Sequence, residues 1–212
     1  MKLLPILFSQ ELIDEIKAGH KTCTRRLVNP QPEINEYDLG KATYHEMDDG
    51  SFLCNSAKFS TVYDFPVYPR YHEADTLYVL QAFKIVEMFE DYDKDTYSMK
   101  ILLRGNDVSK KVLFTKTRFE KFKKFFYKNG WNSPYFMPRE AAEIFLKVKK
   151  VRVERLQDIT DADAIAEGID GDEKPVREAF SRLWNSTLKG DKAVYSWENN
   201  PWVLAYDFER VW

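Results

Sequence analysis

The sequence predicts an α+β fold that is mostly strand, in the form of a small β-barrel with short helices packed on it. Segments with strand character outnumber helical segments, lie far apart in the chain and are joined by short helices. The G-x-G-x-x-G and P-loop sequences that mark doubly wound nucleotide-binding sheets are absent from the sequence. These observations favour a barrel over a doubly wound sheet.

Length and composition predict a single packed domain. At roughly 150 residues per domain, 212 residues correspond to about 1.4 domains. The 15 Phe, 12 Tyr and 5 Trp residues are enough for a substantial core. We therefore expect one domain over residues 1–212, with insertions at about 29–71 and 83–131. The formal charge of −2 means that any contact with nucleic acid needs a local basic patch.

Three features predict a cytoplasmic protein without a membrane segment. No apolar run approaches the roughly 20 residues that a bilayer-spanning helix needs. Residues 1–10 lack the small-residue cleavage site of a secretory signal. Cys23 and Cys54 are too few for a disulfide framework and are expected to be reduced thiols.

The first half of the chain predicts two strands, one helix and an irregular insertion. Residues 1–8 favour a short buried strand, followed by a helix that Ser9 caps and Gly19 ends. Residues 29–71 are rich in Pro and Gly and favour excursions such as a hairpin. Residues 76–80 have the β-branched and aromatic character of a core strand.

The second half of the chain also predicts both strands and helices. Residues 144–153 alternate apolar and polar side chains, as a long half-exposed strand does. Thr160 and Asp163 form a capping box for a short helix that Gly168 ends, with Glu167 in its last turn. Two further elements are predicted: a helix from Pro175 that carries Phe180, Leu183 and Trp184 on one face, and a strand with an aromatic face over 202–208.

Residues 83–131 begin acidic and end basic, and their role is open. Phe119, Phe122 and Phe126 have the spacing of an ordinary amphipathic helix, which favours core packing, while the lysines of that helix remain available to phosphate. Trp131, with Tyr135 and Phe136, suits either a base sandwich or the anchoring of a loop.

Residues 19–26, with the sequence GHKTCTRR, resemble the G-x-K-T-x-T-x-R signature of the ASCH domains in the PUA-like superfamily. Further segments resemble longer, phage-borne members: ADTLYV at 74–79, MPR at 137–139 leading through 151–156 to AIAEG at 164–168, and NPW at 200–202. The resemblance covers about half of the chain. It implies a β-barrel with a cleft that faces RNA or a modified nucleoside, and no cofactor.

In small bacterial relatives that deacetylate N4-acetylcytidine, a Lys, a Thr and a Glu form the catalytic set. The motif places these roles on Lys21 as base, Thr24 as nucleophile and Glu167 as proton donor. Such a base must first lose its own proton, and the alternative is an ordinary Lys–Glu pair. Because residues three apart on a regular strand point to opposite faces, Lys21 and Thr24 act together only across a bend or bulge.

One departure from the family pattern keeps several functions open. Relatives of this size often carry G-D-x-L-x-V-R-E-T-W, where residues 74–83 here are ADTLYVLQAF, so that Gln81 replaces a carboxylate. The competing functions are a hydrolase, an RNA-binding module in which Gln81 contacts a base edge, and a phage factor that binds a host protein through the 83–131 insertion.

Several cationic and polar side chains are candidates for phosphate or base contact. The alternative for the cations is that they are solvated side chains on the exposed face of a sheet. His20, His45 and His72 are scattered without the spacing of zinc ligands, so no metal site is expected. The candidate nucleic-acid-binding residues are Lys21, Thr22, Arg25, Arg26, Gln81, Arg139 and Arg152.

Overall fold

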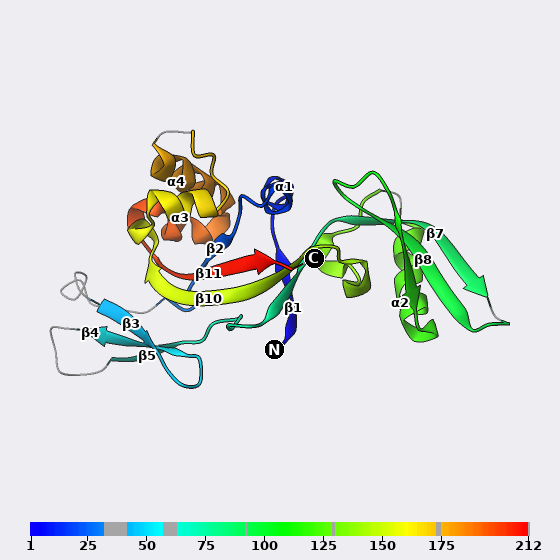
Figure 1. The fold of residues 1–212 in the computed structure, drawn as a ribbon, viewed down its shortest axis with the longest axis horizontal. Coiled ribbons are helices and arrows are strands. Elements are labelled where there is room, and N and C mark those ends of the chain that lie inside the picture. The colour runs from blue at the N-terminus through cyan, green and yellow to red at the C-terminus, as the bar shows by residue number, and fades with distance from the viewer. Residues whose placement is uncertain (32–41, 57–62, 92, 129, 173–174, 212) are drawn as a thin grey trace. The chain divides into compact units, whose positions relative to one another are not determined.

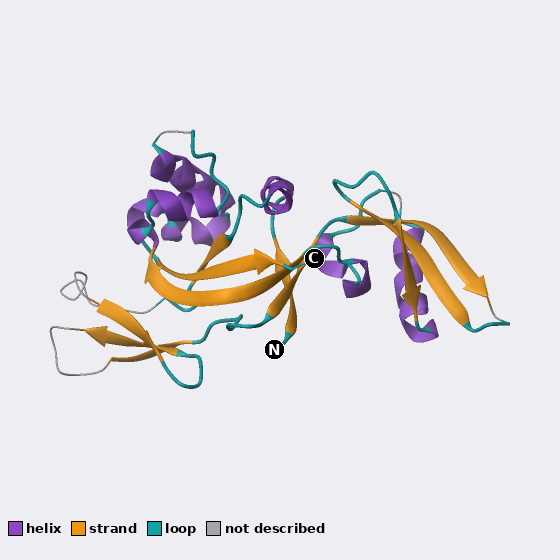
Figure 2. Ribbon diagram, viewed as in Figure 1, coloured by secondary structure: helices purple, strands orange, loops and turns teal. Residues whose placement is uncertain are grey.

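A computed structural model describes residues 1–31, 42–56, 63–91, 93–128, 130–172 and 175–211 (Figures 1 and 2). The chain divides into two compact units. The first unit comprises residue 1, residues 15–75 and residues 147–210, and the second comprises 2–14, 76–146 and 211–212. The predicted insertion at 83–131 lies within the second unit.

The centre of the first unit is strand β11 (Trp202–Arg210), which lies between β10 (Phe145–Arg155) and β2 (Cys23–Leu27). β11 and β2 are antiparallel, with Val203 opposite Leu27 and Asp207 opposite Cys23. The predicted alternation along 202–208 is present, but both faces of β11 are buried between Trp202 and Tyr206. The sheet is therefore covered on both sides here.

Helices α3 (Asp161–Ala166) and α4 (Val176–Thr187) belong to one covering layer. Their apolar side chains share a buried cluster with Val203 of β11. The capping box predicted for α3 is confirmed, since Thr160 Oγ1 accepts a hydrogen bond from Asp163 N and the Asp163 carboxylate bonds back to Thr160 N. We call this side of the sheet the helix face; by register it carries Cys23, Arg25, Leu27, Val203, Ala205 and Asp207.

The opposite side, the aromatic face, carries Thr24, Arg26, Trp202, Leu204, Tyr206 and Phe208. It contacts aromatic residues from the predicted 29–71 insertion, because Tyr44 packs edge-on against Trp202 at 4.8 Å and Tyr71 against Tyr206 at 5.3 Å. The described part of that insertion is an antiparallel three-stranded sheet of β3 (Ala42–Glu46), β4 (Phe52–Ser56) and β5 (Tyr63–Val67). The sequence predicted a hairpin here, and the structure has a third strand beside it.

The second unit begins with the two predicted strands, β1 (Leu3–Leu7) and β6 (Thr76–Leu80), which pair in parallel. Helix α1 (Gln10–Ala18) follows Ser9, whose hydroxyl accepts a hydrogen bond from Leu12 N at 3.4 Å. Gly19 ends the helix at a φ of 83°, as the sequence predicted.

The second unit contains a core whose buried residues lie between Leu80 and Ala142. Strands β7 (Phe83–Asp91), β8 (Thr96–Leu103) and β9 (Lys110–Phe114) form an antiparallel sheet, and α2 (Lys116–Phe126) packs on it. Phe119 and Phe122 are buried in this core, which confirms the core-packing interpretation of the helix. Short 3-10 helices in the described part of the chain include Pro134–Phe136, Arg139–Ala141, Leu156–Asp158, Gly190–Tyr195 and Trp197–Asn199.

The molecule is an α+β protein, mostly strand, with its strands distributed over several sheets. Within the described residues no sheet closes into a barrel, because the strands of 42–67 and 83–114 pair among themselves rather than joining one cylinder. No helix in the described part of the chain is long and apolar enough to cross a membrane.

Candidate nucleic-acid interface and the adjacent charge network

Lys21 is held on the helix face by three acceptors. Its Nζ donates to the backbone carbonyls of Cys23 at 2.8 Å and Glu167 at 2.7 Å, and to Glu167 Oε2 at 2.6 Å. The side chain of Lys21 is 0% exposed and that of Glu167 is 6% exposed. Three acceptors match the three donors of an ammonium group, so this geometry suits the protonated form of Lys21.

The end of α3 is locked against the segment that carries Lys21. Thr22, whose side chain is exposed, donates its backbone N–H to Ala166 O at 2.8 Å. Gly168 follows with a φ of +95°, and a Cβ at this position would lie 3.2 Å from Glu15 Cβ and 3.4 Å from Lys21 Cβ. Glycine therefore allows both the turn and the close approach that bring Glu167 to Lys21.

Arg25 extends the ion pairing along the same face. Its Nε donates to Glu154 Oε1 at 2.8 Å, and Nη1 to Glu167 Oε1 at 3.3 Å. The Arg25 side chain is 1% exposed. Glu167 therefore receives Lys21 on one carboxylate oxygen and Arg25 on the other.

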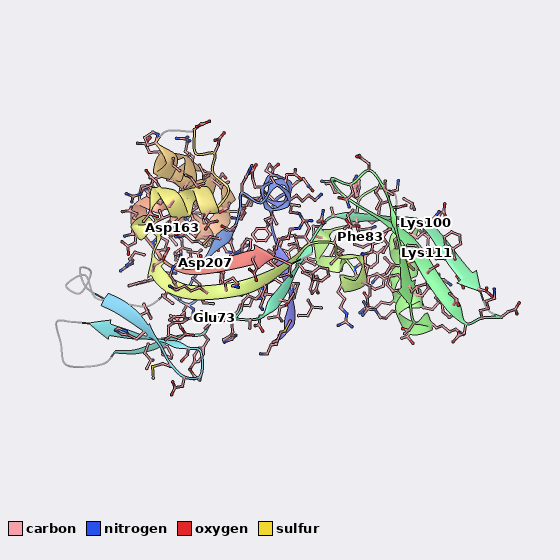
Figure 3. All side chains as sticks on the ribbon, in the orientation of Figure 1. Glu73, Phe83, Lys100, Lys111, Asp163 and Asp207 are labelled. Atoms are coloured by element: carbon pink, nitrogen blue, oxygen red, sulfur yellow. The ribbon has the colours of Figure 1, made fainter. Side chains whose placement is uncertain are left out.

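Arg152 of β10 closes the network at its more exposed side. It contacts Asp207, and its Nε lies 3.4 Å from Glu154 Oε2. Figure 3 labels Asp207 on β11 and Asp163 by α3. Three cations and four carboxylates form what we call the buried charge network, in which Lys21, Arg25 and Glu167 are buried and Arg152, Glu154, Asp163 and Asp207 are half-buried.

Asp163 joins the network to the helix cap. Its Oδ1 lies 3.5 Å from Arg152 and 3.7 Å from Arg25, while Oδ2 accepts from the Thr160 hydroxyl at 2.7 Å. Burial opposes ionisation of Asp163, but the hydrogen bonds from Thr160 and the two guanidinium charges outweigh it and hold the pKa of Asp163 below its usual value.

Cys23 lies within the network as a protonated thiol. Burial raises its pKa, and the negative charge of Glu167 raises it further, against the opposing effect of Arg25. A thiol with a pKa well above its usual range carries no thiolate at neutral pH. Cys23 is a free, buried cysteine, in agreement with the expectation of a reduced thiol.

Lys21 and Glu167 are thus brought together, whereas Thr24 lies on the other side of the sheet. Thr24 is a regular member of β2 opposite Tyr206, and its neighbours Cys23 and Arg25 belong to the helix face. Because side chains alternate along a strand, the buried Thr24 hydroxyl projects onto the aromatic face. The bend needed for joint action with Lys21 is not present in β2 itself.

Arg26 shares the aromatic face with Thr24 but is exposed at its border. Its charge interacts with the phenol groups of Tyr71 and Tyr206, with the carboxylate of Glu167 and, more weakly, with the guanidinium of Arg70. The exposed Arg70 guanidinium lies over the Tyr71 ring at 5.5 Å, and Tyr68, two residues earlier in the chain, is 72% exposed. We call the exposed residues Arg26, Tyr68 and Arg70, together with the buried Tyr71 ring under Arg70, the arginine–tyrosine surface.

Gln81 and Arg139, the remaining predicted site residues, belong to the second unit. Gln81 is buried, and its Nε2 donates to Arg104 O at 3.1 Å. Arg139 is exposed, with its Nε 3.7 Å from Glu140.

The sequence interpretation missed the carboxylates that neutralise Arg25 and Arg152. Glu154 follows Arg152 by two positions on the same strand face, and Asp207 interrupts the apolar run 202–208 of β11, so each acid was a visible candidate partner for a cation. It also missed Arg70, because nothing in the sequence links residue 70 to β2.

No group of three or more potential metal-ligating side chains is found among the residues that the structure describes. No family model, curated protein or solved structure matches the chain.

Proposed function

We propose that the chain binds RNA or a modified nucleoside, and that the arginine–tyrosine surface is its contact site. The observation that carries the proposal is that two cations of the first unit are exposed near the aromatic face: Arg26, at the border of that face, and Arg70, whose guanidinium lies 5.5 Å over the buried Tyr71 ring. Two guanidinium groups on one surface suit phosphate oxygens, and the exposed ring of Tyr68 suits base stacking. The sheet of β2, β10 and β11 would then correspond to the barrel of the ASCH domains that the sequence resembles.

The buried charge network has a supporting role in this proposal. Arg25 and Arg152 are neutralised by carboxylates, so they are poorly suited to hold phosphate as well. Their pairing fixes β2 against α3, which sets the position of Arg26 one residue further along the strand. Of the cations predicted to hold phosphate, we therefore retain Arg26 for this role, and we add Arg70.

The test measures the affinity of the full chain for a fluorescently labelled 12-nucleotide RNA over a range of salt concentrations. Each phosphate contact on a single strand contributes about −0.7 to the slope of log affinity against log salt. The double variant Arg26→Ala/Arg70→Ala should bind more weakly and reduce the slope by about 1.4. Lys189→Ala, an exposed cation elsewhere in the first unit, is the control and should bind like the wild type. Equal affinity and slope in all three proteins would refute the assignment.

A second candidate function, hydrolysis of an N4-acylated cytidine, is favoured by one observation, the 2.6 Å contact between Lys21 Nζ and Glu167 Oε2. Water would add at the acyl carbon and the C–N bond would break, to give acetate and cytidine. Two observations weigh against it. The Lys21 Nζ donates to its acceptors and so has no free electron pair with which to act as a base, and Thr24 projects from the opposite face of the sheet.

Incubation with N4-acetylcytidine decides between the two candidates. Acetate release by the wild type that is lost in Glu167→Gln, with folding retained, would support the hydrolase. If no acetate forms while the RNA affinity behaves as described above, binding is the function and the hydrolase is discarded.

A further inference from the structure

Helix α2 of the second unit presents one stripe of lysines to solvent. At about 100° per residue, Lys121 and Lys124 lie about 60° apart on the side of the helix away from the buried Phe119, and Lys128 follows two residues after the helix ends. All three are exposed. The helix thus separates a lysine stripe from its core-facing side.

Ion pairing on α2 leaves this stripe out. Lys123 lies 2.8 Å from both Glu90 and Glu120, and Arg118 lies 2.8 Å from Glu140. Over the described residues, no carboxylate lies within ion-pair distance of the three stripe lysines. Lys123 and Arg118 are thus neutralised by carboxylates of the same unit, whereas the stripe lysines can bind an anion from outside the protein.

A stack of aromatic rings borders the stripe. Phe125 follows Lys121 by about 40° around the helix. Its ring is covered by the Lys124 ammonium at 5.1 Å and packs at 5.4 Å against Phe136, with 30° between the ring planes. Phe136 is 56% exposed and its neighbour Tyr135 is 73% exposed. The stack therefore ends in rings that face solvent.

We infer that the lysine stripe and this aromatic stack form a binding surface for single-stranded nucleic acid. The lysines hold successive phosphates, and Phe136 with Tyr135 stacks on an unpaired base. Positive charge beside exposed rings is the combination that single strands require, because their bases are free to stack and those of a duplex are not. The surface belongs to the second unit, so the inference goes beyond the proposed function and does not depend on it.

The test uses the full chain with labelled 12-mers of uridine and of thymidine, and an RNA duplex of the same length. The triple variant Lys121→Ala/Lys124→Ala/Lys128→Ala should bind both single strands at least tenfold more weakly and lower the salt slope by about 2. A control variant that removes the same charge elsewhere, Lys94→Ala/Lys189→Ala/Lys192→Ala, should bind like the wild type. The duplex should bind more weakly than either single strand.

Substitutions of Phe136 separate stacking from simple charge attraction. Phe136→Leu should lower single-strand affinity about tenfold, and Phe136→Tyr should restore it, because one stacked ring accounts for a loss of that order. An acidic protein segment is the other partner that lysines attract, and poly-L-glutamate serves as its probe. Poly-L-glutamate binding as tight as that of the single strands, with no dependence on Phe136, would overturn the inference.

The same measurements distinguish binding at the lysine stripe from binding at the arginine–tyrosine surface. Loss of affinity in the α2 triple variant, with none in Arg26→Ala/Arg70→Ala, supports this inference and refutes the proposed function. The reverse pattern overturns the inference alone. The midpoint of urea unfolding, measured for every variant, verifies that each remains folded.

Discussion

Lys21 and Glu167 are 146 residues apart in the sequence, yet Lys21 Nζ and Glu167 Oε2 lie 2.6 Å apart in a buried ion pair. The pair joins the turn after α1 to the end of α3. Because a second cation, Arg25, also contacts Glu167, the carboxylate is held from two directions.

Removal of Lys21 should destabilise the fold more than removal of both partners. Lys21→Met leaves Glu167 buried with less compensation, which costs about 3–5 kcal/mol in the free energy of unfolding. Lys21→Met/Glu167→Leu removes both charges and should recover part of that loss. Urea unfolding of both variants measures the difference. A double variant less stable than Lys21→Met would contradict this account of the pair.

Loss of the α3 cap should weaken the helix by a smaller amount. Thr160→Ala removes the hydroxyl that accepts from Asp163 N and donates to its carboxylate, at a cost of about 1 kcal/mol. Thr160→Ser keeps the hydroxyl and should remain within a few tenths of the wild type. Urea unfolding measures both variants, and equal stability of Thr160→Ala and Thr160→Ser would show that the hydroxyl does not stabilise the helix.

Stability should fall in acid through Asp163. Its pKa is lowered in the folded state, so its contribution is fully present above its unfolded pKa, near 3.9, and is lost as the pH falls through the lower folded value. Asp163→Asn has no such proton to bind. The difference in unfolding free energy between wild type and variant should therefore shrink below about pH 4, and a constant difference down to pH 2 would argue against the assignment.

Stability should also fall in alkali through Tyr206. Burial raises the pKa of Tyr206 to about 12, although backbone hydrogen bonds at Arg70 and Tyr71 act in the opposite direction. The folded state keeps its proton longer than the unfolded state, so the contribution is present below pH 10 and is lost as the pH rises towards 12. The loss amounts to about 2 kcal/mol at pH 12. Tyr206→Phe should show a shallower decline between pH 10 and pH 12; equal slopes would exclude the effect.

Local features could be predicted from the sequence because they depend on neighbours in the chain. Ser9 and Gly19 mark the ends of α1, and the Thr160–Asp163 capping box marks the start of α3, through hydrogen bonds that span only three or four residues. Strand alternation in β11 followed from its residue pattern for the same reason. The lysines of α2 were also visible as one side of an amphipathic helix.

Only the tertiary structure decided how the charges are used. Sheet register put Thr24 and Arg25 on opposite faces of β2, and it paired Arg25 with acids from two distant segments. The neighbour of Arg26 is Arg70, 44 positions along the chain and within the insertion that the sequence left without a role. Such pairings depend on which strands become neighbours. That choice is made by burial of the whole core, whereas the short-range patterns of the chain determine only where each helix and strand begins and ends.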